Sequence, residues 1–144
     1  MQTFLPLPDF TMSAQVLDMR RLGKQRVEAL QIMHAWMNGG GWRNHPATRM
    51  WIDGGHQVAL CDYALSMISE WIRRGYKDTL YPRFTAIRAG LLANGAPSHL
   101  PPWVGDEQFH ASHRSNLLRK DRQWYGQFEW KESDDLPYVW PKGL

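Results

Sequence analysis

The sequence predicts an all-α fold. No stretch alternates apolar and polar residues with the period of two that marks a half-buried strand, whereas several long segments repeat apolar residues at helical spacing. Glycine and proline clusters separate these segments. We expect residues 1–144 to form a compact single domain of four to five helices, with an extended N-terminal arm and an irregular, aromatic C-terminal tail. A chain of 144 residues is long enough to bury one core.

Prolines, a helix cap and a glycine cluster predict the bounds of the N-terminal arm and of the first helix. Pro6 and Pro8 predict an extended arm over residues 1–12. A helix is expected from Ser13, as its N-cap, to about Met37, because three glycines at 39–41 cannot continue it cheaply.

The remaining elements are marked by similar signals. A short helix should begin at Pro46, since proline suits a first helical turn, and end at the Asp-Gly-Gly of 53–55. Prolines make residues 95–104 a loop, and the tail from Trp124 is expected to be irregular. Three longer helices are expected, over residues 56–74, 82–93 and 106–120.

Composition excludes several classes of protein. Hydrophobic residues make up 43% of the chain, which is globular rather than disordered. The single cysteine, Cys61, excludes an intrachain disulfide and a multi-cysteine zinc site, and its apolar helical surroundings predict a buried thiol. No apolar run is long enough to span a membrane and no signal peptide is evident, so we expect a soluble, cytoplasmic protein. The net charge of +3 permits a polyanionic partner.

The first long helix divides into an apolar and a cationic side. The polar side carries Arg20, Arg21, Lys24, Gln25, Glu28 and Gln31, and Arg26 flanks the apolar stripe. Any surface helix shows such a division, but cations crowded on one face repel one another unless an anion binds, and phosphate is the obvious candidate. Gly23 lies in the apolar stripe. Because a glycine in mid-helix costs about 1 kcal/mol against alanine, it predicts the close approach of another helix or a ligand.

Three segments carry a resemblance to a known family. They are "VLDMRRLGKQRVEALQIMHAW", "HPATRMWIDGGHQVALCDYALSMISEWIRRGY" and "HASHRSNLLRKDRQWYGQFEW", and together they cover about half of the chain. In this order they resemble the long arginine-rich first helix, the glycine–histidine segment with its basic-glycine-aromatic end, and the histidine-led helix of the pyrimidine-dimer DNA glycosylase/AP lyases of the phage endonuclease V type.

The resemblance implies an enzyme that excises a damaged or modified base from duplex DNA. We expect no cofactor. The resemblance also implies that the N-terminal amine attacks the sugar C1′, that a Schiff base then permits strand cleavage, and that a glutamate on the first helix assists. Here Gln2 is bulky, so Met1 should be retained and its amine is the expected nucleophile. Arg21 or Gly23 stands where that glutamate would fall. We therefore expect the catalytic residues to be Met1, Glu28 and Arg21, with Glu28 as the acid/base or electrostatic stabiliser.

The resemblance and the clustered charges also give a set of expected nucleic-acid contacts. They are Arg20, Lys24, Arg26, His56, His110, His113, Arg114 and Lys120. His56 follows two glycines at a helix start, where it either packs or faces the substrate. No metal site is expected, and the protein is expected to be a monomer.

Two alternatives stay open. The same cationic face would serve a non-catalytic DNA- or RNA-binding module. A His- or metal-dependent hydrolase is the second alternative, since His110 and His113 lie three residues apart on one predicted helix, but no HExxH-type spacing supports it.

Overall fold

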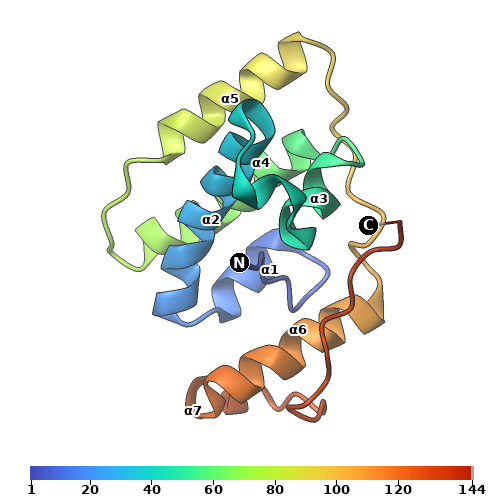
Figure 1. Ribbon diagram of the computed structural model, residues 1–144. Coiled ribbons are helices and arrows are strands. Elements are labelled where there is room, and N and C mark those ends of the chain that lie inside the picture. The colour runs from blue at the N-terminus through green and yellow to red at the C-terminus, as the bar shows by residue number, and fades with distance from the viewer. Residues whose placement is uncertain (144) are drawn as a thin grey trace.

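The computed structural model describes residues 1–143, and all regular structure in that range is helical (Figure 1). The all-α prediction is confirmed. The α-helices are α1 (Phe10–Val16), α2 (Met19–Asn38), α3 (Pro46–Ile52), α4 (Gln57–Arg73), α5 (Tyr81–Ala93), α6 (Glu107–Lys120) and α7 (Arg122–Tyr125). Two 3-10 helices, η1 and η2, cover Gly41–Asn44 and Gly126–Phe128. The helices outnumber the expected four to five because the sequence did not predict the short α1 and α7.

Helix α4 is the centre of the core and packs against α1, α2 and α5. It is the most apolar of the long helices, and Leu60, Tyr63 and Met67 are completely buried. Helices α6 and α7 lie together on one side of the molecule, below the others in Figure 1. Within residues 1–143, no helix combines the length and apolar character needed to cross a bilayer.

The predicted helix from Ser13 to Met37 is wrong in one respect, because it is two helices. Its N-cap is Asp9, whose carboxylate accepts from the Met12 N–H at 2.7 Å. Ser13 lies buried inside α1, where its hydroxyl donates to the carbonyl of Leu7 at 3.0 Å. Serine therefore ties the helix to the preceding arm instead of starting it.

The break between α1 and α2, at Leu17 and Asp18, depends on residues far away in the sequence. Arg74 donates to the Gln15 carbonyl at 3.1 Å, and the Trp124 indole donates to the Val16 carbonyl at 2.8 Å. These bonds satisfy carbonyls that a continuous helix would use internally. The Asp18 N–H donates to the Tyr125 hydroxyl at 3.0 Å, which fixes the start of α2.

The other predicted boundaries are confirmed to within a residue or two. Helix α3 begins at Pro46, and α4, α5 and α6 match the three expected long helices. Asp106 caps α6 by accepting from Gln108 N–H at 3.1 Å. The tail becomes irregular later than expected, because α7 and η2 extend helical structure to Phe128.

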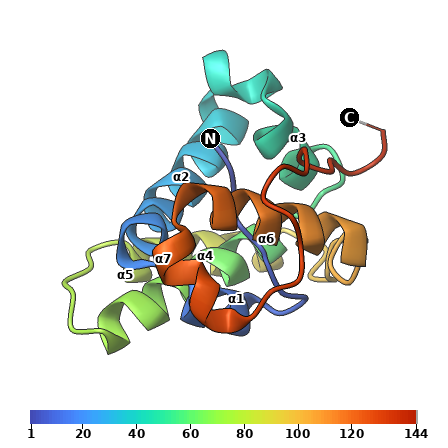
Figure 2. The ribbon, with the colours of Figure 1, turned by 90° about the horizontal axis from the view of Figure 1, so that it is seen from below.

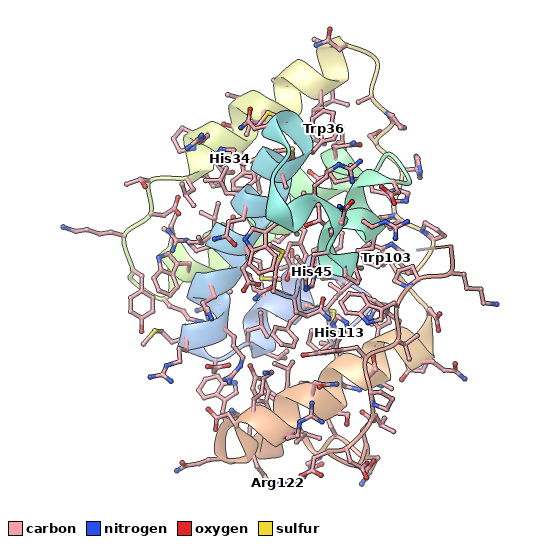
Figure 3. The ribbon with its side chains drawn as sticks, in the orientation of Figure 1. His34, Trp36, His45, Trp103, His113 and Arg122 are labelled. Atoms are coloured by element: carbon pink, nitrogen blue, oxygen red, sulfur yellow. The ribbon has the colours of Figure 1, made fainter. Side chains whose placement is uncertain are left out.

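The N-terminal arm lies between α6 and the rest of the molecule. Viewed from below, it passes behind α6 (Figure 2), and His113 lies on the inner side of that helix (Figure 3). His113 Nδ1 accepts from the Leu5 N–H at 2.9 Å, and His110 Nδ1 lies 2.8 Å from the Leu5 carbonyl oxygen. Arg114 donates to the Pro6 carbonyl at 2.8 Å. Side chains on one face of α6 thus bind the backbone N–H and carbonyl groups of the arm.

The same helix holds the C-terminal tail, which passes in front of it in Figure 2. Leu136 N–H donates to the Ser115 hydroxyl at 3.0 Å, and its carbonyl accepts from the Asn116 amide at 3.0 Å. Val139 N–H donates to the Ser112 hydroxyl at 3.1 Å. Ser112, Ser115 and Asn116 are buried, so these bonds form where water does not compete for them.

Candidate active site

The arm fixes the beginning of the chain against three helices. The Trp51 indole donates to the Thr3 hydroxyl at 3.0 Å, and the Tyr63 hydroxyl donates to the Phe4 carbonyl at 2.8 Å. Phe4 N–H donates to the Gln25 carboxamide at 2.9 Å. This anchoring also fixes the position of Met1. The thioether sulfur of Met1 is a weak acceptor for the Thr48 hydroxyl, at 3.8 Å. The N-terminal segment is therefore held in one place before any ligand binds.

Glu28 of α2 meets this segment. Its Oε2 accepts from the Gln2 N–H at 3.3 Å and from the Gln25 amide at 3.4 Å. Within residues 1–143, Glu28 forms no salt bridge with a lysine or arginine, although Lys24 lies one turn before it. Glu28 is thus a neighbour of the chain terminus rather than the salt-bridge partner of the cationic face.

Electrostatics support the closeness of Glu28 and the N-terminal amine. Burial raises the pKa of Glu28, while the Gln2 N–H, the positive N-terminus, Lys24 and Gln25 each act to lower it. The N-terminal charge also lowers the pKa of His45, after the larger effect of burial. The amine is therefore close enough to act on both groups. A half-buried carboxylate beside an amine can stabilise a cation or exchange a proton.

Two hollows open beside this pair. The first, of about 430 Å³, is rich in polar and cationic groups. Its lining residues are Met1, Gln2, Phe4, Arg20, Arg21, Lys24, Gln25, Glu28, Lys120 and Tyr138. Four of these are cations, from α2 and from the end of α6, so the hollow suits an anionic ligand.

The second hollow, of about 620 Å³, is more apolar. It shares a wall with the first, formed by Met1, Arg20, Lys24 and Glu28. Its other lining residues are Met19, Gly23, Arg26, Val27, Gln31, Trp42 and Trp71. A planar, partly apolar ligand fits such a wall of indole rings. Met1 and Glu28 are thus placed where a ligand spanning both hollows must pass.

Gly23 has the close neighbour that the sequence predicted. A Cβ added there would lie 2.9 Å from Cζ3 of Trp71. The absent side chain lets the Trp71 ring of α4 lie directly against α2 and become part of the second hollow. Trp71 is held by its indole N–H, which donates to the Lys77 carbonyl at 2.8 Å, and by stacking on Tyr76.

The predicted cations differ in how freely they can meet a ligand. Arg20 and Lys24 are exposed, and in residues 1–143 no carboxylate pairs with either. Arg21 pairs with Asp18 at 3.3 Å and still lines the first hollow. Arg26 pairs with Asp78 at 2.6 Å and lies 4.8 Å from the Trp71 ring centroid, so the protein itself already neutralises its charge.

The predicted contacts on α6, other than Lys120, lie elsewhere. His110 and His113 are completely buried, and Arg114 pairs with Glu107 and Glu132. Burial lowers the pKa of His113 to about 3, so this ring is neutral at pH 7. None of the three lines either hollow, and their bonds hold the N-terminal arm. With no exposed surface, the two histidines have no access to DNA in this conformation.

His56 is also placed away from the hollows. It is buried, with its ring centroid 5.2 Å from that of His99, and its Nε2 would contact a Cβ added at Gly54 at 2.4 Å. It packs at the start of α4 and lines neither hollow. In residues 1–143, no three His, Cys, Asp or Glu side chains come together as a metal-binding group. Cys61 is buried as expected, which raises its thiol pKa to about 12.

Sequence reasoning missed the structural importance of Gln25 and Tyr138. Gln25 is buried and binds the Phe4 N–H, the Tyr63 hydroxyl and Glu28. Gln25 lies three residues before Glu28 on the same helix face, and this spacing is the sequence signal that could have indicated its role. Tyr138 lies in an irregular tail, and no sequence pattern connects it to α2.

Comparison with known proteins finds a family match over the first part of the chain. The model of the pyrimidine dimer DNA glycosylase family matches residues 1–81, which is more than half of the 144 residues and includes the arm, Glu28, Trp42 and Trp71. No curated protein and no solved structure matches the chain. The family match implies a DNA substrate. The chain belongs to the pyrimidine dimer DNA glycosylase family.

Proposed function

We propose that this protein excises a damaged or modified base from duplex DNA and then cleaves the strand as an AP lyase. The nucleophile is the N-terminal amine of Met1, and Glu28 is the carboxylate that assists it. The observation that carries the proposal is the 3.3 Å distance between Glu28 Oε2 and the backbone nitrogen of Gln2, the residue next to the amine. A neutral α-amine is a nucleophile that can form a covalent intermediate at a sugar carbon.

The chemistry uses these two groups as follows. The amine nitrogen attacks C1′, the bond between C1′ and the base breaks, and the base leaves with the bonding electrons and gains the proton that the nitrogen gives up. The nitrogen lone pair then opens the C1′–O4′ bond, O4′ gains a proton to become a hydroxyl, and a cationic Schiff base results. Loss of a C2′ proton then expels the 3′ phosphate by β-elimination. Ionised Glu28 stabilises the cation through charge and is within reach to accept a proton.

The two hollows suggest how DNA binds. The first hollow, called the cationic hollow from here on, binds the sugar–phosphate backbone. Arg20, Lys24 and Lys120 are the phosphate contacts, and Arg21 lies at the edge of this hollow. The second hollow takes the extruded base, which packs against Trp42 and Trp71. The attacked sugar then lies at the shared wall, beside Met1 and Glu28.

Borohydride trapping tests the proposed nucleophile. Incubation of the protein with abasic duplex DNA and borohydride should give a covalent adduct, and acetylation of the N-terminus should abolish it. Glu28→Gln should keep DNA binding and lose at least about a hundredfold in adduct formation, because a preorganised charge is worth several kcal/mol at a developing cation. Exposed Glu129→Gln is the matched control, with unchanged trapping expected.

The same experiment separates an enzyme from a binding module. A protein that binds duplex DNA but forms no adduct and releases no base from lesion-bearing duplexes would be a non-catalytic module. An adduct that survives N-terminal acetylation would move the nucleophile to a lysine. Either result would contradict the proposed role of Met1.

A further inference from the structure

Tyr138 joins the cationic hollow from a part of the chain that the family model does not match. It lines the hollow together with Met1 and Glu28, although it lies in the C-terminal tail, well beyond residue 81. Its ring packs near Phe4 of the N-terminal arm, with 6.3 Å between the centroids, and near His113, with 5.6 Å. The tail thus supplies a side chain to the wall that α2 and the arm begin.

The polar face of α6 fixes this position. Backbone bonds on both sides of Tyr138, at Leu136 and Val139, end on the buried side chains of Ser112, Ser115 and Asn116. Two tail residues so held leave the tyrosine between them little freedom. Together with the packing of its ring near Phe4 and His113, these bonds order the side chain during folding, before any ligand binds.

Tyr138 lies near charged groups of the cationic hollow. Burial raises its pKa; the charges of Arg119 and Arg21 act to lower it, and that of Glu28 acts to raise it. The hydroxyl is therefore protonated at neutral pH and is a donor. Within residues 1–143, it takes part in no hydrogen bond to another protein group, so its donor is available to a ligand in the hollow.

We propose that Tyr138 binds the substrate, with its hydroxyl donating a hydrogen bond to a phosphate oxygen of the damaged strand. Its neighbours in the hollow, Arg21 and Lys120 among them, attract an anion, and a phenol hydroxyl beside them adds a directional bond. This inference rests on the proposed function, because it takes the ligand of the hollow to be the nucleotide attacked by Met1. The catalytic segment and the tail then share one substrate site.

Tyr138→Phe tests the proposal, because it removes only the hydroxyl and keeps the ring that packs on Phe4 and His113. The ligand is a duplex with a tetrahydrofuran abasic analogue, which binds but lacks the group that the amine attacks. The dissociation constant should rise about tenfold, as expected for a lost hydrogen bond to a charged group. The slope of log Kd against log salt should stay unchanged, since no cation is lost. The unfolding midpoint should also stay unchanged. Tyr81→Phe, at an exposed tyrosine that lines neither hollow, should bind as wild type.

A second variant tests the role of the tail. Asn116→Ala removes one bond to Leu136 and should weaken DNA binding, as Tyr138→Phe does. In the double variant, the loss of affinity should be smaller than the sum of the two single losses, because both changes act on one contact. Equal affinity of wild type and Tyr138→Phe would overturn the inference. A weakened Tyr138→Phe in a protein that forms no borohydride adduct would instead overturn the Met1 mechanism and leave the Tyr138 contact standing.

Discussion

Glu28 Oε2 lies 3.3 Å from the backbone nitrogen of Gln2, which joins the middle of α2 to the start of the chain. Gln25 strengthens this junction, because it binds the Glu28 carboxylate through its amide nitrogen and the Phe4 N–H through its oxygen. The face of α2 that carries Arg20 and Lys24 therefore also carries the residue that meets the N-terminus. Under the proposed function, DNA bound by these cations would lie next to the amine and the carboxylate.

The pH dependence of lyase activity should depend on Glu28. Only the ionised carboxylate stabilises a cationic Schiff base, so kcat/KM on abasic DNA should fall as pH drops through the pKa of Glu28. Burial raises that pKa above its ordinary 4.5, and the acidic limb should lie correspondingly higher. Lys24 acts to lower the same pKa, so Lys24→Met should move the limb to higher pH.

Lys24→Arg is the matched control for this shift. It keeps the positive charge one turn from Glu28, and its acidic limb should coincide with that of the wild type. A Lys24→Met limb at the wild-type pH, with only the height of the profile reduced, would show that Glu28 is not the titrating group.

Salt dependence should reveal which cations contact phosphate. Each neutralised phosphate contributes about 0.9 to the slope of log K against log salt, so Arg20→Gln, Lys24→Gln and Lys120→Gln should each reduce the slope by roughly one. Arg83→Gln, at a cation of α5 that lies 2.7 Å from His34 and lines neither hollow, should leave the slope unchanged. Equal slopes for all four variants would show that DNA does not bind at the cationic hollow.

Helix boundaries were predictable from sequence where local chemistry decides them. Pro46 at the start of α3, the glycines after α2 and the Asp106 cap of α6 act within a turn of their own positions. The break between α1 and α2 is different. It depends on Arg74, Trp124 and Tyr125, which reach it only in the folded chain, and residues 13–37 alone favour one continuous helix.

The site was predictable in part for the same reason. Helical spacing alone places Arg20, Lys24 and Glu28 on one face, and Gly23 signalled the approach of Trp71. The histidines of α6 attract attention as ligands or phosphate contacts, because sequence does not show that a backbone segment covers them. Leu5 provides that cover, and Tyr138 is brought to the hollow by the same helix. Both depend on long-range packing that no local pattern encodes.

Gly23→Ala should destabilise the protein despite the better helix propensity of alanine. The new methyl group would lie 2.9 Å from the Trp71 ring, which is held by its own hydrogen bond and by Tyr76. Overpacking of this kind costs more than the propensity gain of about 1 kcal/mol, so we expect a net loss of roughly 1 kcal/mol in the free energy of unfolding. In Gly90→Ala, a matched change inside α5, the methyl meets nothing within 4 Å and should stabilise by up to about 1 kcal/mol. The same gain in both variants would show that Trp71 moves aside freely.

Acid should weaken the attachment of the arm to α6. His113 has a pKa lowered by burial to about 3, against 6.5 for an exposed histidine, so between these values the unfolded chain binds the extra proton. Stability conferred by neutral His113 is therefore complete above about pH 6.5 and is lost as pH falls toward 3. His113→Gln keeps an acceptor for the Leu5 N–H but removes the titration. Below pH 6.5 its free energy of unfolding should fall less steeply than that of the wild type, by about 1 kcal/mol per pH unit, in urea melts from pH 7 to 4. Because the carboxylates are the same in both proteins, their contributions cancel in the difference. Parallel profiles would mean that His113 is protonated in the folded state and that its bond to Leu5 does not require the neutral ring.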